Sequence, residues 1–466
     1  MGPAERLAQH LLPVVRVEGE DLRYAIDDRL AAYDCPGVSV AVIENGELAW
    51  AAGYGRIEPG GAAVDADTLF AGASISKPVT AMIALRLVER GLLRLDEDIN
   101  GQLTSWKLPE NALTREVPVT LRMLLGHRAG TTVHGFGGTF GPHEMPTVHD
   151  ILEGRAPARN EPVRVDKLPG GDARYSGGGT TIVQLMIEEA TGKSFAEVAQ
   201  EEIFEPLGMT RSTFARPLPG ALQANAAVGY ENGEVIPYRY SSTASLAAGG
   251  IWTTASDYAR FLIAARDAAR GGRPDLLGGE LAREMMRREG TNEFGLGWSL
   301  VGEGDERRFG HGGSNPGYQC ESFLYEGSGK GAVVMTNSES GLIFYWEVFN
   351  GIADLYGWPG FLQPPKRIMT IPPSDFALYT GDFDIVSGVE MPLLRMFVSD
   401  GRLRSEIPGM RAGVQDVLLD DRGRMFNRNS PFESELVRDA DGRVVEIVAY
   451  VGGTTEIMRA KRRGTS

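Results

Sequence analysis

Cysteine is almost absent from this sequence of 466 residues. Only Cys35 and Cys320 occur, far apart in the chain. Small domains that depend on disulfides carry several cysteines, so a disulfide framework is excluded as the basis of this fold. The two residues leave room for a single bridge, but two free thiols are the simpler expectation. The fold must therefore rest on a hydrophobic core.

Positive charge is also scarce, because 47 lysines and arginines face 62 acidic residues and give a formal net charge of −15. A protein that binds phosphate backbones or anionic membranes needs the opposite balance, so we expect neither nucleic acid nor membrane as a partner. Long hydrophobic runs are missing too, and none could span a bilayer. The only apolar run in residues 1–20 covers residues 11–15, too short for the core of a signal peptide. We therefore expect a cytoplasmic protein.

Lysine is rare in this chain, with seven lysines against forty arginines. One of them ends the segment Ser74-Ile75-Ser76-Lys77, after which apolar residues recur with helical spacing up to Gly91. The pattern predicts a helix that begins near Ser74 and presents Ser74 and Lys77 on one face. Burial favours a neutral amine, which can accept a proton, whereas arginine cannot be deprotonated. The segment therefore predicts a serine nucleophile with an adjacent base.

Ser74 also has a purely structural interpretation. A serine at the start of a helix is far more often an N-cap than a nucleophile, and a four-residue motif is a weak signal by itself. Motifs elsewhere in the chain are needed to distinguish a nucleophile from an N-cap at Ser74.

The first three quarters of the chain alternate between strand and helix patterns. Residues 38–52 predict two strands around an Asn45-Gly46 turn, and strands are also expected at residues 317–323 and 331–335. Helices are predicted after Gly177-Gly178-Gly179 up to Gly192, from an N-cap at Ser256, and over residues 342–356. Residues 131–160 show no periodicity, which is typical of a functional lid or wall. The pattern predicts an α+β fold in which an antiparallel sheet is flanked by helices.

The length of the chain favours two domains. Residues 359–374 are rich in proline and predict a linker. Short alternating segments with regularly spaced turns follow it and predict a small β-barrel or sandwich. We therefore expect domains at residues 1–358 and 375–466.

Two further motifs follow Ser74 in the chain. Tyr175 begins the run Tyr-Ser-Gly-Gly-Gly about a hundred residues later, and His311 lies in Phe-Gly-His-Gly-Gly-Ser just before the closing strands. A Ser-x-x-Lys motif, a tyrosine before a helix and a Lys/His-x-Gly motif at a sheet edge, in this order, resemble the serine β-lactamase and penicillin-binding protein superfamily. Within it the chain is similar to the class C β-lactamase and peptidase S12 group, which includes esterases and D-aminopeptidases. Residues 375–461 resemble the lipocalin-like domain of some S12 peptidases.

The resemblance implies a catalytic domain with an additional all-helical subdomain, and it implies roles for individual residues. Ser74 would attack a carbonyl carbon while Lys77 takes its proton, and Tyr175 would share the base role or pass the proton to the leaving group. The backbone N–H groups of Ser74 and Ser314 would form an oxyanion hole, which is worth ~3 kcal/mol per donor. His311 would belong to the site, and Gly312 and Gly313 would let their strand approach the substrate.

The chain departs from the family pattern at two positions. Family members commonly carry Tyr-x-Asn at the second motif, and the asparagine amide contacts the lysine and the substrate. In this chain the asparagine is replaced by Gly177, which still belongs to the predicted substrate-binding site. His311 in place of a lysine also reduces the positive charge available to hold a substrate carboxylate. Both departures favour esters or uncharged amides as substrates.

The other histidines have structural interpretations. His134, His143 and His149 match no compact metal-binding spacing, and His127 is interpreted as a core or scaffold histidine. We therefore predict no metal and no cofactor.

The sequence predicts a serine hydrolase or acyltransferase that forms an acyl-enzyme on Ser74 with a small-molecule or short peptide substrate. Esterase, amidase or D-aminopeptidase-like activity is favoured. Peptide cyclisation or transesterification, β-lactamase or DD-peptidase activity, and a weakly catalytic sensor remain alternatives. The acyl donor and acceptor and the oligomeric state stay open.

Overall fold

The computed structural model describes residues 1–466 except 142, 291–292, 389–390, 409–412, 452–454 and 465–466. The chain divides into two compact units. The first unit contains Met1–Ala8, Ile26–Tyr345 and Trp358–Gly360, and the second contains Gln9–Ala25, Trp346–Gly357 and Phe361–Ser466. The polypeptide therefore passes between the units at several points of the sequence.

The first unit is built on an antiparallel sheet. Its strands lie in the order β2-β1-β11-β10-β8-β7, and β9 pairs with β10. The bounds are β1 Gly37–Glu44, β2 Glu47–Gly55, β7 Ser299–Val301, β8 Arg308–Gly310, β9 Gly313–Asn315, β10 Tyr318–Tyr325 and β11 Gly331–Thr336. The turn between β1 and β2 has φ of 55° at Asn45 and 78° at Gly46, the positive values that a tight hairpin requires. The predicted hairpin and the two predicted later strands are confirmed.

Helix α11 (Ala255–Ala269) lies against this sheet and contacts β1, β2, β10 and β11. The side chain of Thr254 accepts a hydrogen bond from the Asp257 N–H at 3.0 Å and caps the helix. The prediction of Ser256 as the N-cap is therefore wrong. Ser256 is already inside the helix, where its hydroxyl donates to the Ala66 carbonyl.

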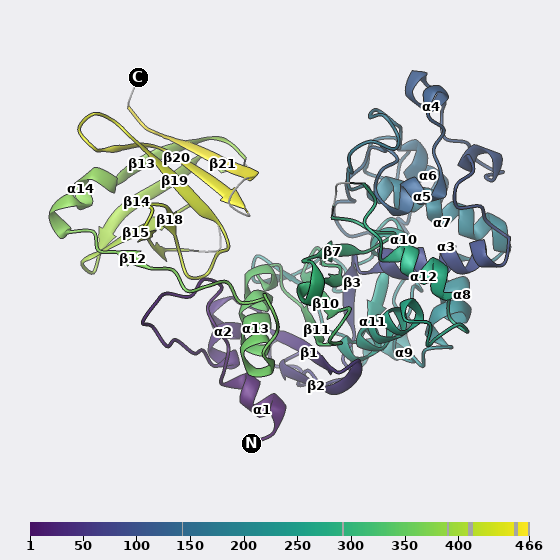
Figure 1. Cartoon of the computed structure of the whole chain (residues 1–466), viewed down its shortest axis with the longest axis horizontal. Helices are drawn as coiled ribbons and strands as arrows, with labels where there is room; N and C mark the ends of the chain where they lie inside the picture. The colour runs from purple at the N-terminus through teal and green to yellow at the C-terminus, as the bar shows by residue number, and fades with distance from the viewer. Residues whose placement is uncertain (142, 291–292, 389–390, 409–412, 452–454, 465–466) are drawn as a thin grey trace. The chain divides into compact units, whose positions relative to one another are not determined.

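A cluster of helices forms the rest of the first unit (Figure 1). Helix α7 (Gly177–Thr191) contacts α3, α5, α6, α8 and α10. It ends at Gly192, whose φ of 68° permits the left-handed cap. The bounds of its neighbours are α3 Ser76–Glu89, α5 Leu121–Leu125, α6 Val148–Glu153, α8 Phe195–Ala199 and α10 Leu246–Gly249. The mixed α+β fold with a helical part is confirmed.

The other elements of the first unit are short. The remaining helices are α1 Pro3–Ala8, α2 Ile26–Ala32, α4 Ala112–Glu116, α9 Gly220–Gln223 and α12 Gly279–Met285. Two small sheets pair β3 (Phe70–Ala73) with β6 (Ile251–Thr253) and β4 (Tyr230–Glu231) with β5 (Glu234–Val235). Helix α13 covers Gly341–Tyr356, as predicted, and the division between the units falls within it.

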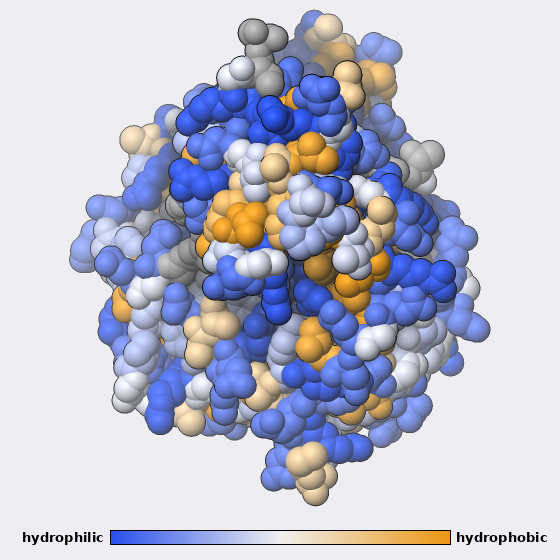
Figure 2. All heavy atoms as spheres, turned by 90° about the vertical axis from the view of Figure 1, so that its left-hand side faces the viewer, coloured by the Kyte–Doolittle hydropathy of each residue, from blue (hydrophilic) through white to orange (hydrophobic). Residues whose placement is uncertain are grey.

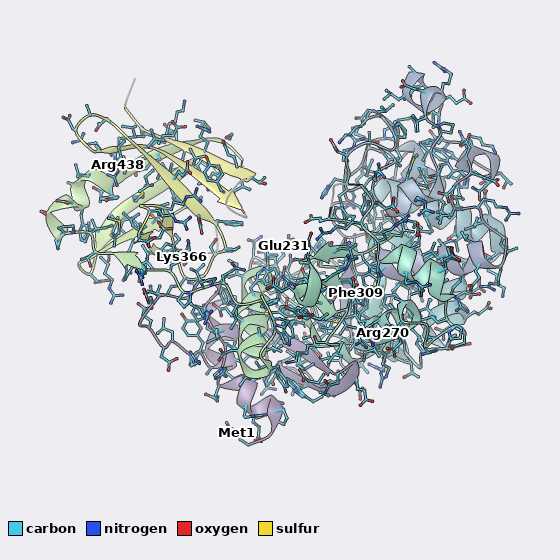
Figure 3. All side chains as sticks on the ribbon, in the orientation of Figure 1. Met1, Glu231, Arg270, Phe309, Lys366 and Arg438 are labelled. Atoms are coloured by element: carbon cyan, nitrogen blue, oxygen red, sulfur yellow. The ribbon has the colours of Figure 1, made fainter. Side chains whose placement is uncertain are left out.

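Large aromatic side chains fill the core of the first unit. Phe309, labelled in Figure 3, and Trp298 are fully buried, and their ring centroids lie 4.9 Å apart. Phe261 of α11 stacks on Trp298 at 5.6 Å. Cys35 and Cys320 are both free and buried, which confirms the prediction of two free thiols. The core therefore joins helix α11 to the sheet without a disulfide.

The second unit contains a curled antiparallel sheet of ten strands in the order β12-β17-β18-β19-β20-β21-β13-β14-β15-β16 (Figure 1). The bounds are β12 Ile368–Met369, β13 Gly381–Ser387, β14 Leu393–Ser399, β15 Arg402–Glu406, β16 Gln415–Asp416, β17 Leu418–Asp420, β18 Met425–Phe426, β19 Glu433–Arg438, β20 Val444–Val451 and β21 Thr455–Arg462, with helix α14 Phe376–Tyr379 before β13. Phe383, Met396 and Ile447 are buried in its core. Lys366, labelled in Figure 3, pairs with Asp420 at 3.4 Å and with Glu433. The predicted C-terminal barrel is thus a half-barrel.

The face shown in Figure 2 is mostly hydrophilic, with smaller hydrophobic groups between the charged side chains. Exposed apolar residues of the second unit include Ile368, Met369, Val386, Val398 and Phe432. Dispersed apolar side chains of this kind are normal for a protein surface. Among the described residues, no helix is long and apolar enough to cross a membrane.

Candidate active site

Ser74 lies in the turn between strand β3 and helix α3. The helix begins at Ser76 with Ile75 at the N-cap position, and no side chain caps it. Ser74 Oγ instead accepts a hydrogen bond from Lys77 Nζ at 3.0 Å. The interpretation of Ser74 as an N-cap is therefore wrong, and its hydroxyl is placed beside an amine at the start of a helix.

The side chain of Lys77 is buried, and its amine is held by hydrogen bonds. Only 4% of the residue is exposed. Nζ donates to the Ala248 carbonyl of α10 at 2.7 Å and lies 4.8 Å from the centre of the Tyr175 ring. These contacts fix the amine within proton-transfer distance of Ser74 Oγ.

Tyr175 stands just before α7 and is surrounded by other rings. The centroid of its ring lies 4.4 Å from that of His127, 5.0 Å from His134, 6.0 Å from His311 and 6.1 Å from Phe294. The fold thus brings together Lys77, Tyr175 and His311, which are far apart in the sequence.

His311 follows the end of β8 and is 6% exposed. Its Nδ1 lies 2.6 Å from the Gly312 carbonyl, which can only accept, so Nδ1 carries the proton. Burial, and then the nearby Lys77, lower the pKa of His311 to about 3. The imidazole is therefore neutral at ordinary pH and supplies no positive charge to the pocket.

Strand β9 approaches β3 very closely at Gly313. A Cβ atom at this position would lie 2.2 Å from the Gly72 carbonyl oxygen and 2.7 Å from Cys320 Sγ. Next to it, Ser314 pairs with Gln319 of β10, whose Nε2 donates to Ser314 Oγ at 2.9 Å. Gly313 therefore allows the segments that carry Ser74 and Ser314 to pack together.

All the residues predicted for the site line one pocket of about 650 Å³. Its lining also includes His134, Gly135 and Phe136 of the predicted lid or wall. Residues that the sequence did not indicate complete it: Thr243, Ala248, Gly249, Phe294, Ser299, Asn315, Gln319, Leu342 and Tyr345. Among the described lining residues, Lys77 is the only lysine, arginine or acidic residue. The pocket is thus lined mainly by neutral polar and aromatic groups.

A family model described as Beta-lactamase matches residues 22–342. This is well over half of the sequence. The chain belongs to the Beta-lactamase family. The match covers the sheet, the helical cluster and every residue of the Ser74 pocket named above except Tyr345, so this beta-lactamase family member has the fold that its three motifs predicted.

Its relatives include hydrolases of different names. The chain is 28% identical over 280 residues to "Unguisins hydrolase ungD'" of Aspergillus campestris, covering 55% of this chain and 48% of that protein. It is 29% identical over 210 residues to "Esterase EstB" of Burkholderia gladioli, covering 44% of this chain and 52% of EstB. The chain thus spans about half the length of each of these relatives. An octameric penicillin-binding protein homologue from Pyrococcus abyssi shares the fold, with a TM-score of 0.61, 21% identity, and coverage of 93% of this chain and 98% of that one.

Position 177 of this family member is tightly surrounded. The Gly177 N–H donates to the His134 carbonyl at 2.9 Å, and a Cβ atom there would lie 3.1 Å from Phe136 Cε2. The segment 134–136 belongs to the region predicted as a lid or wall, and it does line the pocket. The same region contains helix α6, which was not predicted because residues 131–160 show no periodicity. The capping box of Thr147 and Asp150 is the sequence signal that could have revealed it.

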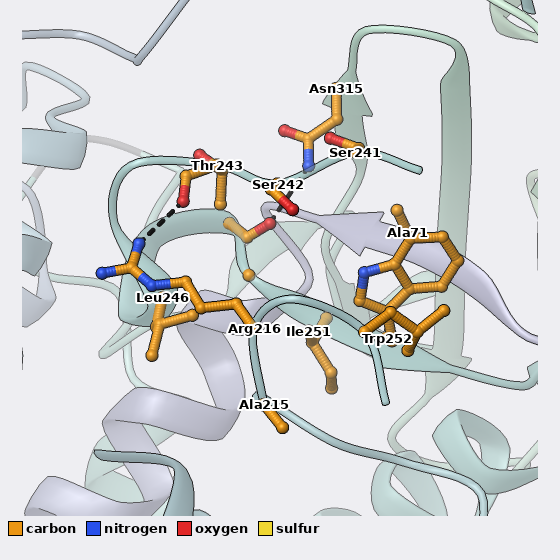
Figure 4. A pocket seen from close by; sticks show the side chains of 13 residues that line it. Ala71, Ala215, Arg216, Ser241, Ser242, Thr243, Leu246, Ile251, Trp252 and Asn315 are labelled. Carbon is orange, nitrogen blue, oxygen red and sulfur yellow. Dashed lines mark hydrogen bonds between the residues drawn. The ribbon is translucent and has the colours of Figure 1, made fainter. Parts of the chain in front are cut away.

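A much smaller cavity of about 10 Å³ shares Thr243, Gly249 and Asn315 with the pocket (Figure 4). The Arg216 guanidinium donates to the Thr243 carbonyl at 2.9 Å, as the dashed line in Figure 4 shows. Ser241 Oγ, also in its lining, finds no hydrogen-bond partner among the described residues. The cavity has room for about one water molecule.

The described part of the chain holds no group of three or more histidine, cysteine or acidic residues that could bind a metal ion. His149 Nε2 instead lies 2.8 Å from Ser105 Oγ. Positions 134, 143 and 149 therefore do not form a cluster in this fold.

Glu321 of β10 lies next to Gly312, and the ionisation of its carboxyl group should affect the free energy of unfolding of the protein. A Cβ atom at Gly312 would lie 2.7 Å from Glu321 Oε2. Burial removes the hydration of the Glu321 carboxyl group and raises its pKa to about 8, whereas the pKa is about 4.3 in an unfolded chain. Between these values only the folded state keeps the proton, so the free energy of unfolding falls as the pH rises, by at most about 1.4 kcal/mol per pH unit.

Glu321→Gln should remove this dependence. The free energy of unfolding of the variant minus that of the wild type is expected to grow as the pH rises from about 5 to 8. Urea unfolding at several pH values measures it. A difference that stays constant with pH would contradict the buried, protonated carboxyl.

Proposed function

We propose that this protein is a serine hydrolase that cleaves uncharged esters or amides through an acyl-enzyme on Ser74. The observation that carries the proposal is the 3.0 Å contact between Ser74 Oγ and Lys77 Nζ inside the large pocket. A hydroxyl beside a buried amine is the arrangement that covalent acyl transfer needs.

The residues divide the reaction between them. Ser74 Oγ attacks the carbonyl carbon and forms the tetrahedral intermediate as Lys77 Nζ takes its proton. The backbone N–H groups of Ser74 and Ser314 hold the oxyanion, at ~3 kcal/mol per donor. Tyr175 passes the proton to the leaving group. The bond to the leaving group then breaks and leaves the acyl-enzyme. Water attacks the acyl-enzyme and gives a proton to Lys77, and this second proton passes to Ser74 Oγ as the acyl–Oγ bond breaks.

The lining of the pocket supports an uncharged substrate. His311 is neutral because burial lowers its pKa to about 3. Gly177 offers no side chain to the substrate, and Gly312 and Gly313 leave their strand open to it. Lys77 is the only lysine, arginine or acidic residue of the described lining, and its amine is engaged with Ser74 and Ala248. A substrate carboxylate would therefore lose its hydration without gaining a partner of opposite charge.

We also propose that residues 375–466 form a lipocalin-like domain after the linker at 359–374. Nine of the ten strands of the curled antiparallel sheet, β13 to β21, lie within residues 375–466 and support this proposal, whereas β12 lies within the proposed linker.

Intact-protein mass measurement tests the nucleophile. A fluorophosphonate should add one label to the wild type and none to Ser74→Ala, and peptide mapping should place the label on Ser74. p-Nitrophenyl butyrate should be hydrolysed at least about tenfold faster than the negatively charged p-nitrophenyl hemisuccinate, since one missing charge partner costs more than 1.4 kcal/mol.

Other outcomes would contradict the proposal. A label that survives in Ser74→Ala would remove Ser74 as the nucleophile. Acylation by esters without turnover would indicate a sensor, and turnover of a penicillin but not of esters would indicate a β-lactamase. Faster hydrolysis of the hemisuccinate would overturn the uncharged substrate.

A further inference from the structure

His127 lies directly against Tyr175 at the back of the pocket. The residue is 4% exposed, and its ring centroid lies 4.4 Å from that of Tyr175. Of the rings around Tyr175 it is the nearest, although His127 itself does not line the pocket. His127 therefore contacts the tyrosine and does not face the pocket in which a substrate would bind.

His127 also holds the backbone on both sides of Tyr175. The Arg174 N–H donates to the His127 carbonyl at 2.7 Å, and the Ser176 N–H donates to His127 Nδ1 at 3.3 Å. One residue thus fixes the chain before and after Tyr175 and packs on the ring between them. All three contacts are to the same tripeptide, residues 174–176.

The bond from Ser176 requires a neutral imidazole with its proton on Nε2, because a protonated ring has no acceptor at Nδ1. Burial lowers the pKa of His127 well below its usual value, and Lys77, His311 and His134 lower it further. The acceptor is therefore present throughout the pH range in which an esterase is assayed.

We propose that His127 is a positioning residue that sets the place of the Tyr175 ring relative to Lys77 and Ser74. The inference rests on the proposed function, in which Tyr175 passes the proton to the leaving group. Displacement of a proton donor by about 1 Å can cost about 100-fold in rate, so the contacts of His127 have a large effect without touching the substrate.

The backbone of His127 dictates the choice of variants. Its φ is 57°, a left-handed conformation that asparagine tolerates well. His127→Asn keeps this conformation and offers an amide oxygen to the Ser176 N–H, but it removes the ring. His127→Phe keeps a ring against Tyr175 and removes the acceptor. His149→Asn, at a histidine that contacts Ser105 away from the pocket, is the matched control.

A double-mutant cycle with Tyr175→Phe tests the inference on p-nitrophenyl butyrate. His127→Asn should lower kcat about 10- to 100-fold in the wild-type background, with KM changed less than about threefold, and His127→Phe should lower it less. In the Tyr175→Phe background each should lower kcat less than about threefold, because the group that it positions is already missing. His149→Asn should have no effect in either background.

Three outcomes would overturn the inference. Equal losses in both backgrounds would show a general structural role, and no loss in the wild-type background would show that Tyr175 does not need His127. If His127→Asn does not fold, a soluble His127→Phe variant with equal losses in both backgrounds overturns it as well. Labelling of Ser74→Ala by the fluorophosphonate would instead contradict the proposed function. Failure of the His127 inference and failure of the proposed function are therefore distinguishable.

Discussion

Lys77→Arg is expected to lower kcat/KM for p-nitrophenyl butyrate by about 10³-fold, within the range that a general base contributes. Arginine keeps the positive charge but cannot lose a proton, so it cannot accept the proton of Ser74. Lys77 Nζ is held 3.0 Å from Ser74 Oγ and 2.7 Å from the Ala248 carbonyl. A larger, planar guanidinium cannot reproduce both contacts in this buried niche.

Lys77→Met separates the charge of the lysine from its basicity. Methionine has a similar length and no charge, so both variants should lose activity to a similar degree if proton transfer is the role of Lys77. Initial acylation rates from stopped-flow release of p-nitrophenol measure the effect, and thermal unfolding checks that each variant is folded. Activity of Lys77→Arg within tenfold of the wild type, with Lys77→Met inactive, would show that the charge alone is required.

Local sequence signals predicted the elements whose geometry depends on neighbouring residues. The turn at Asn45-Gly46 and the helix stop at Gly192 depend on positive φ values, which these residue types supply. Ser74 and Lys77 meet because they are three residues apart at the start of a helix. The error at Ser256 was also local, since Thr254 two residues earlier offers the same hydroxyl.

Long-range contacts had no such signal. Nothing in the periodicity around Tyr175 indicates that it lies over Lys77, and only the order of the three family motifs predicted that they share a site. The wall formed by His134 and Phe136 closes over Gly177 through tertiary packing. His127 was interpreted as a scaffold residue, but its neighbour in space is Tyr175, 48 positions away, and no local pattern connects the two.

Gly313→Ala is expected to lower kcat/KM by about 10²-fold or more, comparable to the loss of one oxyanion donor. The new Cβ atom would lie 2.2 Å from the Gly72 carbonyl oxygen and 3.2 Å from Ala73 Cβ, and neither the backbone oxygen nor the Cβ atom can rotate away. Strands β3 and β9 must separate, which moves the N–H groups of Ser74 and Ser314 apart. Overpacking of this kind should also lower the free energy of unfolding by about 1–3 kcal/mol.

Gly312→Ala is the matched variant for this prediction, because it adds the same methyl group one residue away. Its nearest neighbour would be Glu321 Oε2 at 2.7 Å, the end of a side chain that can move. We therefore expect a clearly smaller loss of activity and stability than for Gly313→Ala, measured by kcat/KM on p-nitrophenyl butyrate and by urea unfolding. Equal losses in the two variants would mean that the adjacent glycines serve the substrate alike. A loss confined to Gly313→Ala would instead tie activity to the close contact between β3 and β9. Only in that variant does the new methyl group press against a backbone atom of the neighbouring strand.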